Sequence, residues 1–259
     1  MKKRRIFLLL TVFVGIAFFV SQFLPFELRY WVGLGLSLLV ASGFLIAFWG
    51  LVKKRRNLVW ALILPVAISL SSCLFYFLSP GTWIWRLILT SFFVIVFYSC
   101  LLAENVFLVS IELKVLPLYR AAWTVGFLTI LLVSFFFFNL ILSFRLPFWA
   151  NGLIVLGTVL PLTLHFFWST AIASHADFDI LLHGLIFSVM IAEIATIISF
   201  WPVGVGKGAL YLTSLFYVFG GLFRAEADKK LFRRTVWEFV WVGIGIFLAL
   251  FLVTSWRGN

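Results

Sequence analysis

The stretch Tyr119–Phe144 reads YRAAWTVGFLTILLVSFFFFNLILSF, and after Arg120 it contains no charged side chain. This run exceeds the roughly 20 apolar residues that an α-helix needs to cross about 30 Å of hydrocarbon. Similar runs recur along the whole chain, with only short connections between them. The sequence therefore predicts a membrane-spanning helix here and a chain built from such helices.

The composition of the whole chain agrees with this interpretation. Of its 259 residues, 64% are hydrophobic and 11% are charged, whereas soluble domains carry about 25% charged residues. The sequence lacks the strand-like alternation, over about 10 residues, that is typical of a membrane β-barrel. We predict an all-α fold, a polytopic transmembrane bundle of about nine spans that forms one integral-membrane domain, residues 1–259. The predicted spans are about 6–24, 31–52, 58–78, 84–110, 119–144, 148–170, 180–201, 209–222 and 237–256.

Basic residues and tryptophans give two independent indications of orientation. With the N-terminus inside, fifteen of the twenty Lys and Arg residues fall in cytoplasmic segments, in accord with the positive-inside rule. The other five are Arg29, Arg86, Arg145, Lys207 and Arg257. The twelve Trp residues fall near predicted span ends, where their amphipathic rings prefer to lie. We therefore predict a cytoplasmic N-terminus and an external C-terminus.

The net charge of +11 is distributed in short clusters between the apolar runs. No nucleic-acid partner is predicted, because no connection is large enough to present a folded basic surface. The elbow Arg224–Arg234 combines cations with Leu231 and Phe232 at near-helical spacing. It predicts either contact with anionic lipid at the bilayer surface or a connecting loop that sets the topology. The lipid bilayer is the partner that the sequence indicates, and a membrane-protein partner is left open.

Glu193 is the first functional candidate, because ionisable groups inside hydrocarbon are costly and often functional. It lies in the predicted span 180–201, roughly 12 Å from the outer end at 1.5 Å per residue. A carboxyl group there is expected to be protonated or to pair with a cation, and Arg86 is the nearest candidate cation. A structural pair and a role in proton or solute movement are the alternatives.

The hairpin between the spans 148–170 and 180–201 is the second candidate. Antiparallel geometry places His165 and His183 at similar depth, and the connection carries His175, Asp177 and Asp179. These groups are of the kind that form metal or proton sites. However, their spacing matches no zinc motif, and polar residues in connections normally face water. An interfacial role is therefore the alternative.

Other polar and small residues have structural interpretations. Glu104, near the inner end of its span, is predicted to form an interfacial ion pair with Arg120 or Lys114. Asn151 is predicted to join a hydrogen-bond network between helices. The segment Val203–Gly208 is predicted to be a flexible turn, because its lysine is followed by Gly rather than by the Ser or Thr of a phosphate-binding loop.

Five stretches of the chain together resemble the sequences of one protein family. They are ENVF (104–107), RAA with VGFLT (120–122 and 125–129), LSFRLPFWAN (142–151), SFWPV (199–203) and LFRRTV (231–236). Together they resemble an uncharacterised multispanning family of small-genome candidate-phylum bacteria. The resemblance implies a location in the bacterial inner membrane. It implies no activity, so no functional residue is carried over from it.

The sequence contains no GxSxG or HExxH motif. No catalytic, cofactor-binding or metal-binding residue is therefore predicted. The first interpretation is a non-enzymatic integral membrane protein with a scaffold, accessory or envelope role. The alternatives are a small transporter or permease that uses Glu193, and an enzyme for lipid-linked substrates that uses His165, His183 and Asp179.

Overall fold

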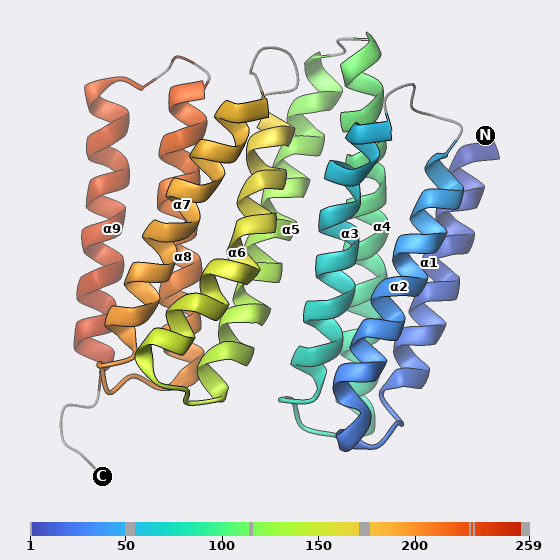
Figure 1. Ribbon diagram of the computed structural model, residues 1–259, viewed down its shortest axis with the longest axis horizontal. Helices are drawn as coiled ribbons and strands as arrows, with labels where there is room; N and C mark the ends of the chain where they lie inside the picture. Colours follow the sequence, from blue (N-terminus) through green and yellow to red (C-terminus); the bar gives the residue numbers. More distant parts are fainter. Residues whose placement is uncertain are drawn as a thin grey trace. The chain divides into compact units, whose positions relative to one another are not determined.

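The computed structural model describes residues 2–49, 55–113, 116–170, 177–227, 229 and 231–254. Within these ranges nine helices are long and apolar enough to cross a membrane (Figure 1). The predicted fold class is confirmed: the chain is an all-helical protein of the multi-pass membrane type. The helices are α1 (Lys2–Ser21), α2 (Arg29–Phe48), α3 (Arg55–Tyr76), α4 (Trp83–Leu113), α5 (Leu116–Ser143), α6 (Phe148–Thr170), α7 (Asp177–Ile198), α8 (Val205–Ala227) and α9 (Arg233–Val253).

The largest difference from the predicted spans is in α8. The sequence predicted a short span at about 209–222, whereas the helix extends over Val205–Ala227. The prediction of a flexible turn at Val203–Gly208 is wrong from Val205 onward. The Gly208 amide donates to the Gly204 carbonyl at 3.0 Å, and the Lys207 ammonium donates to the Val253 carbonyl at 3.1 Å. Glycine lowers helix propensity, but in an apolar medium the need to bond each backbone amide outweighs that preference.

The chain forms two compact units, Met1–Val133 and Ser134–Asn259, whose boundary lies within α5. In the first unit α2 packs on α3, and α4 packs on both α1 and α3. Stacked aromatic rings join α1 to α2 and to α4, with centroids 4.8 Å apart for Phe7 and Phe48 and 4.4 Å apart for Phe18 and Phe93. A single domain over 1–259 stays a prediction.

In the second unit α6 and α7 form the closest helix pair, and they lie side by side in Figure 1. Glycines permit this approach. A Cβ atom at Gly152 would collide with the Thr196 methyl group, and one at Gly184 would lie 2.6 Å from Leu164 Cδ2. The pair α8–α9 uses the same device, because a Cβ atom at Gly221 would collide with the Phe239 ring. Small residues that let backbones approach are the usual means of helix packing in lipid.

The close contact at Gly152 generates a stability prediction. Replacing Gly152 with Leu should lower the free energy of unfolding by about 1–3 kcal/mol, because the added atoms overpack the α6–α7 contact. Gly157→Leu is the matched control, since a Cβ atom there meets nothing within 4 Å, and it should change stability by less than about 0.5 kcal/mol. Unfolding of both variants in mixed detergent micelles measures the difference. Equal stability of the two variants would contradict the packing described here.

The orientation of the termini also stays a prediction, and reporter fusions test it. Alkaline phosphatase folds only outside the cytoplasm, because it needs its disulfides. Fused after Asn259 it should be active, and fused after Arg56 it should be inactive. The reverse pattern would show that the N-terminus lies outside and the C-terminus lies in the cytoplasm.

Candidate functional site

A buried hydroxyl cluster joins α6 to α7. Thr163 Oγ1 lies 2.7 Å from Ser188 Oγ and 2.9 Å from the Gly184 carbonyl oxygen. Ser188 Oγ lies 2.6 Å from the same carbonyl. Both side chains are fully buried. Their hydroxyls bond across the helix contact, which is one of the forces that associate helices in a medium without water.

A second polar contact holds the other end of this helix pair. The Asn151 amide donates to Ser199 Oγ at 3.0 Å and to the Leu146 carbonyl at 3.2 Å. The predicted participation of Asn151 in an interhelical network is confirmed. Together with the Thr163–Gly184 contact, it fixes the antiparallel register of α6 and α7.

This register brings His165 and His183 to similar depth, but it places them on different sides of α6. Thr163 and Phe167 both face α7, since the Phe167 ring lies 5.7 Å from the His183 ring. His165 is two residues from each and therefore about 200° around the helix. It is fully buried and packs on Trp168, with ring centroids 5.6 Å apart. His183 instead contacts the aromatic cluster of Phe167 and Phe223.

The structure describes only part of the remaining residues of the hairpin. His175 lies outside the described residues. Asp177 and Asp179 are in the first turn of α7, and their side chains are outside what the structure describes. Among the described residues, no three His, Cys, Asp or Glu side chains are grouped so that they could hold a metal ion.

Glu193 lies on the outer, exposed face of α7. Its carboxylate has no hydrogen bond or ion pair with any residue that the structure describes, and its backbone carbonyl accepts a bond from Thr196 Oγ1 at 2.6 Å. Five further exposed side chains follow the same face at intervals of three or four residues. They are Leu182, Ile186, Val189, Ile197 and Phe200. The residues on the opposite side, Ile191 and Ala195, are fully buried. The α7 face, as we call this stripe of six residues, is therefore an apolar surface with one carboxylate.

Arg86, the predicted partner of Glu193, has partners within the first unit. Its Nε donates to the Tyr76 hydroxyl at 2.9 Å, and its guanidinium lies 4.4 Å from the centre of the Phe23 ring. The Tyr76 hydroxyl donates in turn to the Gln22 carbonyl at 3.1 Å, and the Gln22 amide donates to Thr90 Oγ1 at 2.9 Å. This network ties the end of α1 to α3 and α4. The charge of Arg86 is thus held by groups that stabilise the bundle.

Glu104 is fully buried in α4, one turn after the buried Cys100. Arg120, one of its predicted partners, is exposed, and Lys114 lies outside the described residues. Glu104 therefore sits deeper in the protein than an interfacial ion pair requires. The predicted pair stays a prediction.

No family model, curated protein or solved structure matches the sequence. The class of the protein consequently rests on the nine apolar helices found among the described residues, and its function rests on the geometry of the groups described above. Of these groups, Glu193 is an ionisable side chain that is exposed on a helix long and apolar enough to cross a membrane and that bonds to no described residue.

The sequence interpretation missed the network around Tyr76 and the hydroxyl cluster around Thr163. Gln22 was a usable signal, because it is the only glutamine in the chain and lies inside the predicted span 6–24. Hydroxyl residues give a weaker signal, since most Ser and Thr side chains in membrane helices bond to their own backbone. Here Thr11, Ser37 and Thr129 do so.

The Tyr76 network predicts a specific loss of stability. Tyr76→Phe removes one hydroxyl that both donates to the Gln22 carbonyl and accepts from Arg86, so unfolding should become easier by about 1–3 kcal/mol. Tyr98→Phe on α4 is the matched control, because no described residue bonds to its hydroxyl, and it should be neutral within about 0.5 kcal/mol. The two variants are compared by chemical unfolding in detergent. A neutral Tyr76→Phe would show that the network contributes no stability.

Proposed function

We propose that the chain is a non-enzymatic scaffold or accessory protein of the bacterial inner membrane, and that the α7 face binds another membrane-spanning protein. The observation that supports the proposal is the exposed carboxylate of Glu193. Its position is five residues before the end of α7, which is about 7 Å at helical rise. An exposed group at this depth meets hydrocarbon unless a partner covers it.

The energetics favour a partner. A charged side chain at the centre of a membrane helix costs about 2.5–3.5 kcal/mol on insertion scales, and the cost is smaller near the helix end, where Glu193 lies. A cation on a neighbouring helix would offset this cost, and attraction between opposite charges is strong where water is excluded. The apolar residues on both sides of Glu193 would supply the packing surface of the contact. We therefore assign to the α7 face a transmembrane helix that carries Lys or Arg at the depth of Glu193.

A second copy of this chain is a poorer occupant of the face. Two copies that met symmetrically through α7 would bring two Glu193 carboxylates together, and like charges at close range repel. Arg86, the cation that was predicted to pair with Glu193, already bonds to Tyr76. The partner is therefore a different protein.

The other functional interpretations have less support. A transporter needs a water-filled path to Glu193, but this side chain lies on the exposed outer face of α7, among apolar residues. An enzyme that uses the hairpin needs His165 and His183 on one groove, but they lie on different sides of α6. Anionic lipid at the Arg224–Arg234 elbow stays a prediction. There Arg234 forms an exposed ion pair with Glu238 at 3.1 Å.

Site-specific photocrosslinking in native membranes tests the proposal. A photoreactive amino acid replaces Ile197 on the α7 face or Leu153 on α6, which are 60% and 61% exposed and lie at nearly the same depth. We expect a protein adduct from position 197 that maps to a membrane span with Lys or Arg, and no such adduct from position 153. Glu193→Gln should reduce the adduct at least about tenfold, because it removes one member of a buried charge pair.

Three outcomes would overturn the proposal. They are adducts with lipid alone, an adduct with a second copy of this chain, and an adduct whose yield is the same in Glu193→Gln. The unfolding measurement described above, applied to Glu193→Gln, separates loss of binding from loss of fold. Substrate-dependent flux in liposomes that Glu193→Gln abolishes would support the permease instead.

A further inference from the structure

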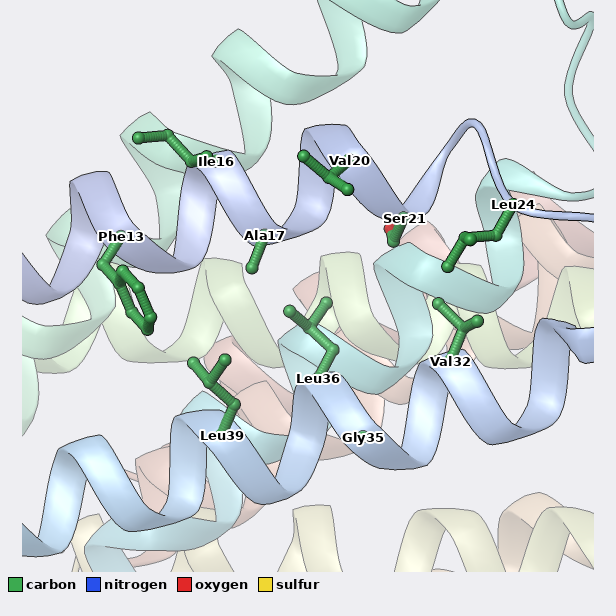
Figure 2. A pocket seen from close by; sticks show the side chains of 10 residues that line it. All are labelled: Phe13, Ile16, Ala17, Val20, Ser21, Leu24, Val32, Gly35, Leu36 and Leu39. Carbon is green, nitrogen blue, oxygen red and sulfur yellow. The ribbon is translucent and has the colours of Figure 1, made fainter.

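A groove of about 380 Å³ lies between α1 and α2 in the first unit. Figure 2 shows Phe13, Ala17 and Leu24 pointing toward α2 and Leu36 and Leu39 pointing toward α1. The remaining lining residues are Ile16, Val20, Ser21, Val32 and Gly35. Phe13, Ile16 and Val20 are exposed, so the groove opens on the outer surface of the helices, where the bilayer lies.

The groove follows from how these two helices pack. They are close at one end, where the Phe7 and Phe48 rings stack and a Cβ atom at Gly43 would collide with Leu10. At the other end the chain passes from α1 to α2 through residues 22–28. Gly33 turns toward α3, with Leu70 at 3.3 Å from its Cβ position, whereas Gly35 leaves open space on the groove side.

The lining of the groove fits a hydrocarbon chain. Of its ten residues, Ser21 alone has a polar side chain, and its hydroxyl already donates to the Phe18 carbonyl at 2.6 Å. The groove therefore offers no hydrogen bond to a ligand. From Phe13 to Ser21, the last residue of α1, it extends over about 12 Å at helical rise, and one leaflet takes about half of the ~30 Å hydrocarbon thickness of a bilayer. The groove therefore has room for most of the length of one acyl chain in one leaflet.

A cation lies one helical turn before the first groove residue of α2. Arg29 begins α2 one turn before Val32, on the same side of the helix as the groove residues. Its guanidinium lies 3.9 Å from the centre of the Phe26 ring, and its Nη2 donates to the Tyr30 hydroxyl at 2.8 Å. Among the described residues no carboxylate pairs with it. The side chain is held in place while its charge stays available to an anion.

We propose that this groove binds one phospholipid, with an acyl chain between α1 and α2 and the phosphate on Arg29. An anionic phospholipid is favoured over a zwitterionic one, because a choline or ethanolamine headgroup adds a positive charge beside the guanidinium. The lipid fills the space between the two helices. The site is independent of the α7 face and of the function proposed for it.

Lipid photolabelling of the full-length chain in liposomes tests the site. The probe is phosphatidylglycerol with a diazirine at the end of one acyl chain, and phosphatidylcholine with the same chain serves as the comparison. The label should concentrate at the deep end of the groove, on Phe13 and Leu39. Phosphatidylglycerol should label these positions about fivefold more than phosphatidylcholine, because one interfacial cation contributes about that preference.

Two variants separate the parts of the proposal. Gly35→Leu fills the groove, since a Cβ atom there meets nothing within 4 Å, and it should abolish the label at Phe13 and Leu39. Gly245→Leu is equally unhindered on α9 and should leave that label unchanged. Arg29→Gln should remove the preference for phosphatidylglycerol while the label itself persists, and Arg145→Gln should keep the preference.

Labelling that is spread evenly over the exposed helices would overturn the proposal, because it would show general bilayer contact. Labelling of Gly35→Leu at the wild-type level would overturn the acyl-chain site. A preference for phosphatidylglycerol that survives in Arg29→Gln would overturn the phosphate site. A failed fold is recognised from detergent unfolding, and the Gly35→Leu variant is expected to fold, because Leu has a higher helix propensity than Gly.

Discussion

Inside hydrocarbon, a backbone amide or carbonyl without a hydrogen bond costs several kcal/mol. This constraint explains why the described parts of the chain are helical almost throughout and why the connections between helices are short. It also explains the length of α8, which continues through Gly206 and Gly208 although glycine is a poor helix former. Hydroxyl side chains obey the same constraint. Thr11, Ser37 and Thr129 each bond to the carbonyl four residues earlier.

Hydrogen bonds within each helix do not make helices associate, and the hydrophobic effect does not either, because lipid tails are as apolar as the side chains. Association therefore needs another driving force. Close packing supplies it where glycines allow the backbones to approach, as at Gly43, Gly152 and Gly184. Interhelical hydrogen bonds supply it at the Thr163–Ser188 contact and at Asn151. The α6–α7 pair has both devices, which accounts for its being the closest pair in the second unit.

The spans could be predicted from the sequence because they depend on hydropathy summed over about 20 residues. The faces of the helices could not. Helices such as α5 are apolar on all sides, so their periodicity does not indicate which side packs and which side meets lipid. The depth of Glu193 was therefore predictable, but its direction was not, and the same holds for His165 and His183. The network of Tyr76, Gln22 and Arg86 joins residues far apart in the sequence, and such contacts are set by tertiary packing alone.

The direction of each charged group decides how it can act. Arg86 points into the bundle, where Tyr76 and Phe23 hold it, so its charge serves the fold and is not available to a second protein. Glu193 points outward from α7, and Arg29 lies one turn before an apolar groove and forms no ion pair with a described carboxylate. A charged side chain that has no partner within the fold must find an opposite charge or a polar group in its surroundings. In a membrane those surroundings are water at the surface, lipid headgroups and other helices. We propose that a helix of another protein supplies the opposite charge at the depth of Glu193, and that a lipid phosphate supplies it at Arg29.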